Sequence, residues 1–234
     1  MLEFRLHNKE SAVEKHTGAA QRGRPREFDP DQALDRALEV FWRKGYEGAS
    51  IAELTEAMGI NRPSLYAAFG NKEELFRKAL DRYSQGPAAY TYEALEEPTA
   101  RAVVGRLLRE AADALTDPNS PHGCLGVQGA LVCGDAAQSI KQELCSRQTR
   151  WQMALQRRFG RARREGDLAE GVSCADLAQY VATVVQGMAV QAAGGATRTQ
   201  LRRVAELALQ AWSAWAHQPS PNAPVACEAT DAGG

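Results

Sequence analysis

Apolar residues recur at spacings of three and four along most of this chain, which predicts amphipathic helices separated by short loops. The first helix is expected to begin after Asp29, an acidic cap followed by proline, and to run to about Lys44. Its broad apolar face consists of Ala33, Leu34, Ala37, Leu38, Phe41 and Trp42. A turn from Gly45 to Gly48 then ends the helix.

Two short helices joined by a tight turn are predicted over residues 50–69. Ser50 and Glu53 have the spacing of a capping box, in which each side chain accepts a hydrogen bond from the other residue's backbone N–H. Gly59 stands where a left-handed residue ends the first helix, and Asn61 can cap the second. This pattern is typical of a helix-turn-helix, whose second helix enters the major groove of DNA with its N-terminal residues.

The second of these helices presents Arg62, Ser64 and Tyr66 on its outer side, near its N-terminus. A further helix follows Asn71, which has the capping-box spacing to Glu74. The N-terminal part of the chain is therefore expected to form a compact helical module built on a three-helix helix-turn-helix domain.

Beyond this module the pattern remains helical but is interrupted by proline and glycine. Helices are predicted over residues 90–97, 99–115 and 135–166, followed by one that begins at Cys174 and one that ends near Trp215. Between them, residues 122–134 form a small-residue segment that allows close packing or leaves room for a ligand. The expected fold is all-α, with about nine helices. Its expected parts are an extension at 1–21, a DNA-binding domain at 22–83, a helical domain at 84–217 and a disordered tail at 218–234.

Composition changes this picture in one respect. The 234 residues have a formal net charge of −1, whereas many DNA-binding proteins carry a clear positive excess. Positive charge is instead local, in the run from Arg22 to Arg26 just before the first helix. We interpret Arg24 and Arg26 as an arm that lies along phosphates or reaches into the minor groove. The alternative is a solvated basic linker.

Other functional classes receive little support from the sequence. No stretch approaches the roughly 20 apolar residues that span a bilayer, and no signal peptide is evident, so a cytoplasmic protein without a membrane partner is expected. The five cysteines are odd in number and lack zinc-ligand spacing, which favours reduced thiols and no metal or cofactor. Serine, cysteine and histidine show no catalytic spacing, so we do not expect an enzyme.

Several of these features occur together and in register. They are Gly23-Arg24-Pro25-Arg26, Ala37-Leu38, Phe41, Gly45-Tyr46, Ser50-Ile51, Ile60, Ser64-Leu65-Tyr66, Phe69 and Lys72-Glu73-Glu74-Leu75. Over residues 22–83 this set resembles the N-terminal domain of TetR/AcrR-type transcriptional regulators. The resemblance implies an all-helical homodimer with a C-terminal effector-binding domain. It most often implies a repressor that a small molecule releases from a pseudo-palindromic operator in double-stranded DNA.

The same resemblance supplies candidate DNA contacts. Tyr66 matches a tyrosine that commonly binds a backbone phosphate, Lys72 matches the lysine at the start of the fourth helix, and Ser50 matches a hydroxyl position before the second helix. Arg62 and Ser64 occupy exposed positions on the recognition helix. At Ala67 many members carry a polar residue that reaches DNA, so base readout is expected to rest on Arg62, with guanine O6 and N7 as its preferred target.

The last two predicted helices carry regular apolar stripes that suit an antiparallel pair. The family uses these helices as a four-helix bundle across the dimer twofold, so the stripes are a candidate interface; the alternative is an intramolecular core. The assigned interface residues are Leu177, Val181, Val184, Met188, Leu201, Val204, Ala208 and Trp215.

We assign Cys124, Gln128 and Trp151 to the effector site. The stretch ending in Gly123-Cys124 and the stretch Gln186-Gly187-Met188 resemble ComR-type members of the family, which are linked to copper response. A regulator that senses copper, an oxidant or an electrophile through Cys124, with Cys133 or Cys145 as second thiol, is therefore an alternative. The remaining readings are a packed free cysteine at this position, and a helical ligand-binding protein that no longer binds DNA.

Overall fold

The structure is a computed structural model that describes residues 28–132 and 137–215, except the side chains of residues 130–132 and 213–215. In these residues the chain is all-helical, as predicted. The helices are α1 (Pro30–Gly48), α2 (Ile51–Met58), α3 (Arg62–Phe69), α4 (Lys72–Gln85), α5 (Tyr90–Glu93), the 3-10 helix η1 (Ala94–Glu96), α6 (Ala100–Ala114), α7 (Leu125–Val132), α8 (Gln138–Arg164), α9 (Cys174–Ala193) and α10 (Arg198–Trp215).

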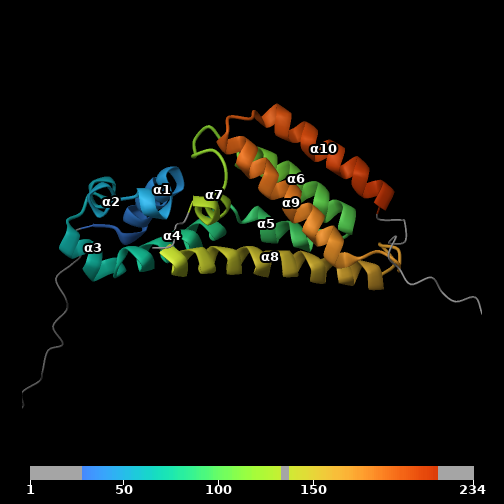
Figure 1. Ribbon diagram of the computed structural model, residues 1–234, viewed down its shortest axis with the longest axis horizontal. Helices are drawn as coiled ribbons and strands as arrows, with labels where there is room; N and C mark the ends of the chain where they lie inside the picture. The colour runs from blue at the N-terminus through green and yellow to red at the C-terminus, as the bar shows by residue number, and fades with distance from the viewer. Residues whose placement is uncertain (1–27, 133–136, 216–234) are drawn as a thin grey trace, which may run out of the picture.

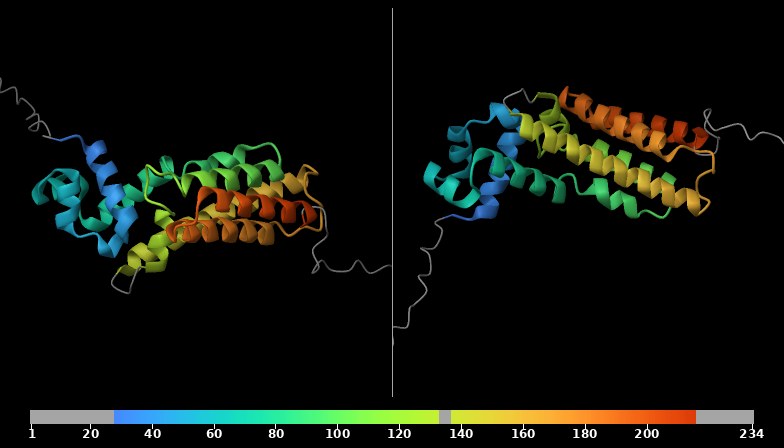
Figure 2. Two further views of the ribbon diagram at one scale, coloured as in Figure 1. Left: turned by 90° about the horizontal axis from the view of Figure 1, so that it is seen from above. Right: turned by 60° about the horizontal axis from the view of Figure 1, so that its bottom comes forward.

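Helices α1 to α4 form one end of an elongated molecule, and α5 to α10 form a bundle at the other end (Figure 1). Helix α8 runs along the bundle and reaches the N-terminal helices, so it bridges the two parts (Figure 2). The end of the first helix also follows the prediction. Gly45 leaves helical geometry with φ of 70°, which kinks α1 one residue after Lys44.

The N-terminal helices close around a core of aromatic and aliphatic side chains. Phe41 of α1 and Phe76 of α4 meet edge to face with their ring centroids 4.9 Å apart, and both are fully buried. Leu125, Ile140 and Leu144 belong to the same core although they come from α7 and α8. The core of the N-terminal part therefore extends beyond the expected domain end at residue 83.

Helix α7 occupies the segment that was expected to be a small-residue stretch, which raises the number of α-helices among the described residues to ten. The small residues allow the close packing that their composition suggested. A Cβ atom at Gly129 would lie 2.9 Å from Cδ1 of Leu144, so a larger residue there would require the Leu144 side chain to move. Tertiary packing therefore stabilises a helix whose sequence carries weak helical signals.

The last two helices are not packed mainly against each other. Helix α10 packs along α6, and α9 packs along α8. The apolar face of α10 packs against α6, and Leu201 and Trp212 on it are only 1% exposed. The Trp212 ring also meets Phe159 of α8, with centroids 5.1 Å apart and the planes tilted by 48°. The expectation of an antiparallel seam between the last two helices was therefore wrong in its pairing, because spacing defines an apolar face but not its partner.

Candidate DNA-binding and effector sites

The helix-turn-helix forms as its capping residues predict. Ser50 and Glu53 make both hydrogen bonds of the capping box at the start of α2. Gly59 ends α2 in the left-handed region with φ of 68°, and the N–H of Ile60 donates to the Thr55 carbonyl oxygen at 3.1 Å. Asn61 caps α3 by accepting from the N–H of Ser64 at 2.8 Å. These bonds fix the turn that orients the recognition helix.

Helix α3 has one buried face and one exposed face. Leu65 and Phe69 are buried against the N-terminal core, whereas Arg62, Tyr66 and Ala67 are exposed. Tyr66 is 50% exposed, which places a large aromatic ring on the surface of the described part of the chain. Arg62 and Tyr66 therefore lie together on one exposed surface, as predicted, with Ser64 half-buried at its edge.

Ser50 has a different role from the other candidates. Its hydroxyl donates to Oε2 of Glu53 at 2.9 Å, and its backbone N–H donates to the same oxygen at 3.0 Å. Phosphate oxygens only accept hydrogen bonds, so a residue whose donors are both directed at a carboxylate suits capping better than phosphate binding. Glu53 is held by Lys44 as well, and these hydrogen bonds lower its pKa to about 2.

Lys72 lies at the first position of α4, next to the end of the recognition helix. Its ammonium Nζ sits 4.5 Å from the ring centroid of Tyr46, a cation–π contact that restrains the side chain. Partial burial lowers the pKa of Lys72, and the carboxylate of Glu47 opposes that shift. The predicted arm residues Arg24 and Arg26 lie outside the described part of the chain.

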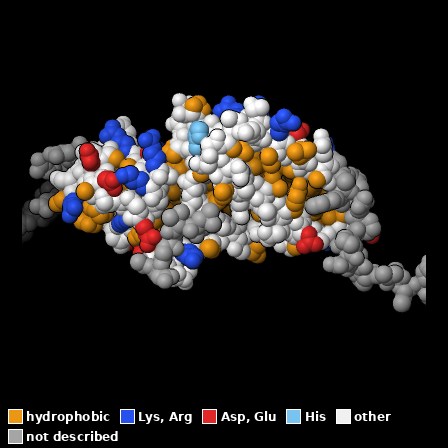
Figure 3. Space-filling model, turned by 45° about the horizontal axis from the view of Figure 1, so that its top comes forward, with side chains coloured by type: hydrophobic (Ala, Val, Ile, Leu, Met, Phe, Trp, Pro, Cys, Tyr) orange, Lys and Arg blue, Asp and Glu red, His pale blue; other side chains and the backbone are white. Residues whose placement is uncertain are grey.

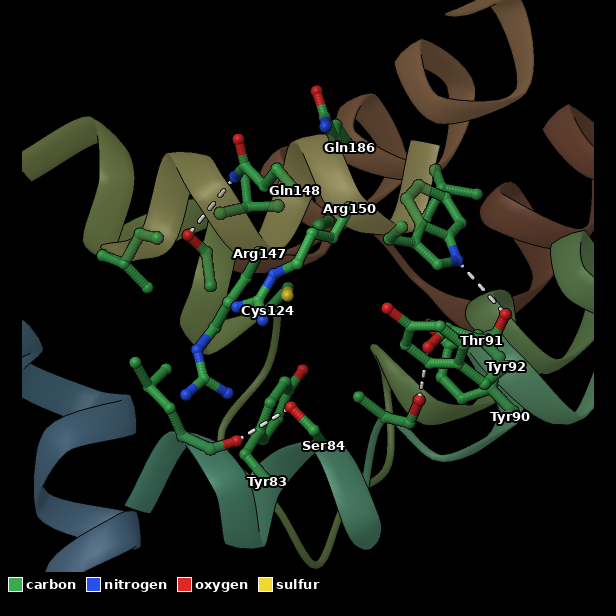
Figure 4. Close-up of a pocket in the computed structure, with 18 of the residues that line it drawn as sticks. Tyr83, Ser84, Tyr90, Thr91, Tyr92, Cys124, Arg147, Gln148, Arg150 and Gln186 are labelled. Carbon is green, nitrogen blue, oxygen red and sulfur yellow. Dashed lines mark hydrogen bonds between the residues drawn. The ribbon is translucent and has the colours of Figure 1, made fainter. Parts of the chain in front are cut away.

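A cavity of about 290 Å³ opens where α4, α5, α7, α8 and α9 meet. Figure 4 shows tyrosines from α4 and α5 on one side and polar side chains of α8 on the other. Leu115, Val127, Leu144 and Val185 contribute most of the aliphatic wall. The volume is at the lower end of small-molecule pockets, and the apolar wall with few polar groups is typical of them.

Two of the three predicted effector residues line this cavity. Cys124 is a free, half-buried thiol, and Trp151 is 9% exposed with its indole N–H donating to the Thr91 carbonyl oxygen at 3.1 Å. Gln128 is not in the lining; its amide instead donates to the His122 carbonyl oxygen at 3.2 Å and holds the loop before α7.

Sequence reasoning missed the other polar groups of the cavity. Burial raises the pKa of Tyr83 and of Tyr90, and both phenols lie near the Cys124 thiol. Arg147 and Arg150 approach from α8. The spacing of Leu144, Arg147, Gln148 and Trp151 marks one face of a helix, but this signal covers only part of the site and does not identify what lies opposite.

The assigned dimer stripe is mostly inside the protomer. Five of its members have at most 6% exposure, namely Leu177, Val181, Met188, Leu201 and Ala208. Val184 is half-buried, Val204 is 43% exposed, and the side chain of Trp215 is outside the described set. Residues buried in one chain offer almost no area to a second, so these five form the intramolecular core that was the stated alternative.

Residues 28–132 and 137–215 show no membrane-spanning helix and no metal site. No helix there is long and apolar enough to cross a membrane. Within the same ranges, no group of three or more histidine, cysteine, aspartate or glutamate side chains could hold a metal ion. Cys133, one of the two thiols considered as a partner of Cys124, is outside these ranges, and Cys145 is exposed.

A helix-turn-helix with an exposed recognition helix, joined to a helical domain with an apolar cavity, defines a DNA-binding transcriptional regulator. Residues 33–79 match the family described as "Bacterial regulatory proteins, tetR family", and residues 98–208 match "Tetracyclin repressor-like, C-terminal domain". The HTH-type transcriptional repressor ComR of Escherichia coli (strain K12) is 34% identical over 193 residues, which cover 82% of this chain and 92% of ComR. The chain belongs to the TetR family.

Two further relatives are informative. The HTH-type transcriptional repressor BdcR of Escherichia coli (strain K12) is 39% identical over 109 residues, or 46% of this chain and 55% of BdcR. A cysteine-substituted form of the TetR family transcriptional regulator CifR, solved with a 26-base-pair operator DNA, is 44% identical. It superposes with a TM-score of 0.78 over 81% of this chain and 100% of CifR.

Proposed function

We propose that this protein is a homodimeric repressor that binds a pseudo-palindromic operator and leaves it when a small molecule occupies the C-terminal cavity. The proposal rests on one structural observation: a single helix, α4, connects the recognition helix with the cavity. Helix α4 adjoins the exposed recognition helix at one end and supplies Tyr83 to the cavity wall at the other. ComR and BdcR are named repressors, and CifR is bound to operator DNA, which supports the same role here.

The test is a gel shift with the DNA that flanks the protein's own gene, with a fragment in which one half of the inverted repeat is scrambled as control. A specific complex containing two protomers is expected, because two recognition helices should enter major grooves about 34–36 Å apart or a multiple of it. Equal binding to both fragments, or binding to neither, would favour a helical ligand-binding protein without operator function.

Within this complex, Arg62 is assigned to a base edge, and Ser64, Tyr66 and Lys72 are assigned to phosphates. Arg62 is exposed in the first turn of α3, where the recognition helix meets the groove floor. Arg24 and Arg26 retain their proposed role as an arm along the DNA backbone or in the minor groove.

Replacing Arg62 with alanine is expected to weaken operator binding by about 1–3 kcal/mol and to relax the preference at one base pair. Lys72→Ala is the matched comparison. It should weaken all sequences alike and lower the slope of log affinity against log salt by about one, because a phosphate contact releases a counterion. Fluorescence anisotropy on operator variants at several salt concentrations measures both. If Lys72→Ala altered base preference while the salt slope stayed constant, the two roles would be exchanged.

The proposed dimer interface lies on the outward faces of α9 and α10. Hydrophobic side chains gather on this side of the molecule, as Figure 3 shows. Val190, Val204 and Leu207 are 45%, 43% and 64% exposed. Gly187 is exposed on the same side of α9 as Val190, and a Cβ atom there would meet nothing within 4 Å. A glycine that costs helix propensity without serving a neighbour in its own chain is explained by close approach of a partner helix.

A second mode of release is favoured by the position of Cys124. The thiol lies in the cavity wall, one residue after Gly123, whose carbonyl oxygen accepts from the indole N–H of Trp42 at 3.2 Å. An adduct on the Cys124 sulfur would therefore occupy the cavity next to a direct hydrogen bond to the DNA-binding domain. Copper alone receives less support, because no three-residue ligand group is found among the described residues.

Replacing Cys124 with serine tests this mode. We expect the wild-type repressor to lose operator affinity after treatment with N-ethylmaleimide, and the Cys124→Ser variant to resist it. Cys145→Ser is the matched control, since Cys145 is also a free thiol but is exposed on α8. Mass spectrometry of the modified protein identifies the site. Equal sensitivity of wild type and Cys124→Ser would leave small-molecule binding as the mode of release.

A further inference from the structure

The cavity has an uneven distribution of charge that bears on its ligand. Arg147 and Arg150 of α8 both line it and are three positions apart in the sequence, so they lie on neighbouring turns of the helix. Figure 4 shows both side chains extending from α8 on the same side of the cavity. The lining also includes the indole of Trp151 and the aliphatic side chains of Leu115 and Val185. The site therefore combines a cationic edge with an apolar interior.

The two arginines differ in how well their charges are neutralised. Arg147 donates to Oδ1 of Asp81 at 2.7 Å and to Oε1 of Glu143 at 2.7 Å, and its side chain is 25% exposed. Arg150 lies 3.8 Å from that same Glu143 oxygen, beyond hydrogen-bond distance, and its side chain is 61% exposed. Glu143 is thus already engaged, and Arg150 is the cation at the cavity with capacity for a further anion.

From this arrangement we propose that the effector is an amphipathic carboxylate. Its head group binds Arg150 and Arg147, and its hydrocarbon body lies against Trp151 and the aliphatic wall. Arginine suits this role because its planar guanidinium binds carboxylates through two parallel hydrogen bonds. The aliphatic part of the wall, from Leu115, Val127 and Val185, favours a hydrocarbon body, because polar groups buried against it would lack partners.

The volume sets the size of the ligand. The cavity of about 290 Å³ corresponds to about ten water molecules at about 30 Å³ each. An acid with about ten non-hydrogen atoms fits that space, which is the size of octanoate.

The same geometry links the acid to release from DNA, a step that rests on the proposed repressor function. Asp81 is on α4, the last helix of the DNA-binding module, and its bond to Arg147 ties that helix to α8. A carboxylate that binds Arg147 competes with Asp81 and loosens this tie. The acid thereby favours an arrangement in which α4 and the recognition helix have moved relative to the bundle.

The test compares sodium octanoate with octanamide, which has the same length but no charge, by isothermal titration calorimetry on the full-length protein. We expect octanoate to bind wild-type protein at least tenfold more tightly than octanamide. Arg150→Gln should remove this preference and Arg150→Lys should retain part of it. Arg157→Gln is the matched control, an exposed arginine on the same helix away from the cavity, and should leave the preference unchanged.

Equal binding of octanoate and octanamide to wild type, no binding of octanoate, or an undiminished preference in Arg150→Gln would overturn the carboxylate assignment. Operator titrations without acid separate this failure from failure of the proposed function. If wild type binds operator but not octanoate, the ligand class is wrong and the repressor stands. If it binds octanoate with the stated preference but no operator, the site stands and the repressor function fails.

Discussion

Replacing Leu207 with aspartate is expected to convert the proposed dimer into monomers and to lower operator affinity by a factor of about 10²–10⁴. Among the described residues, Leu207 is the most exposed large hydrophobic side chain, at 64%, and Val204 lies three residues earlier on the same face of α10. A twofold interface would place a carboxylate from each protomer in an apolar contact without a partner. The factor is large because binding of the second half-site then no longer benefits from the connection to the first.

Analytical ultracentrifugation measures the first effect, and anisotropy with labelled operator at fixed salt measures the second. Met153→Asp is the matched control. Met153 is 49% exposed but belongs to α8, outside the proposed interface, so this variant should remain dimeric and keep its affinity. A Leu207→Asp protein that sediments as a dimer with unchanged operator affinity would place the interface elsewhere.

The N-terminal domain could be predicted almost residue by residue because its signals are local. A capping serine, a left-handed glycine and an asparagine cap act on their own or adjacent turns, so their spacing determines structure before tertiary contacts are known. Ser50, Gly59 and Asn61 do in the structure what their spacing predicted. The outward position of Arg62 and Tyr66 follows from the inward position of Leu65 and Phe69.

The C-terminal part depends on contacts between distant residues, which spacing does not specify. Leu201 and Trp212 mark the apolar face of α10, but only the three-dimensional arrangement shows that α6 covers it. Likewise, Arg147 and Arg150 read as ordinary charges on a long helix until the fold places α4 and α5 opposite them. The cavity is a property of five helices, and its polar groups could not be assembled from any one of them.

From the sequence, Trp42 could be predicted only to be a core residue, because its contact partners lie far away along the chain. Its ring packs edge to face on Tyr83, with centroids 4.7 Å apart at 82°, and its indole N–H bonds to the loop that carries Cys124. The side chain of Trp42, on α1, thus contacts both α4 and the loop that leads into α7. A ligand that displaces Tyr83 or Cys124 in the cavity would therefore disturb the contacts of Trp42. The coupling free energy between the cavity and the DNA-binding surface is expected to be about 1–3 kcal/mol, as is typical of coupled sites.

Replacing Trp42 with alanine is therefore expected to lower the free energy of unfolding by about 3–5 kcal/mol, because Trp42 is only 4% exposed and its loss leaves a cavity. Trp42→Phe keeps an aromatic ring against Tyr83 but leaves the Gly123 carbonyl oxygen without its donor, at a cost of about 1–3 kcal/mol. The Gly123 N–H donates to the Leu115 carbonyl oxygen at 2.9 Å, which restrains this residue in its wild-type position.

Urea unfolding at one protein concentration measures both losses, and the concentration must be held constant because a dimer's stability depends on it. Amide hydrogen exchange locates them. Trp42→Phe should accelerate exchange in α1 and in residues 115–124, whereas Trp212→Phe is the matched control in the other core and should accelerate exchange in α6 and α10. The contradicting result is a Trp42→Phe protein that loses stability while exchange at 115–124 stays at the wild-type rate. That result would show that the hydrogen bond to Gly123 does not stabilise this loop and that Trp42 acts through ring packing alone.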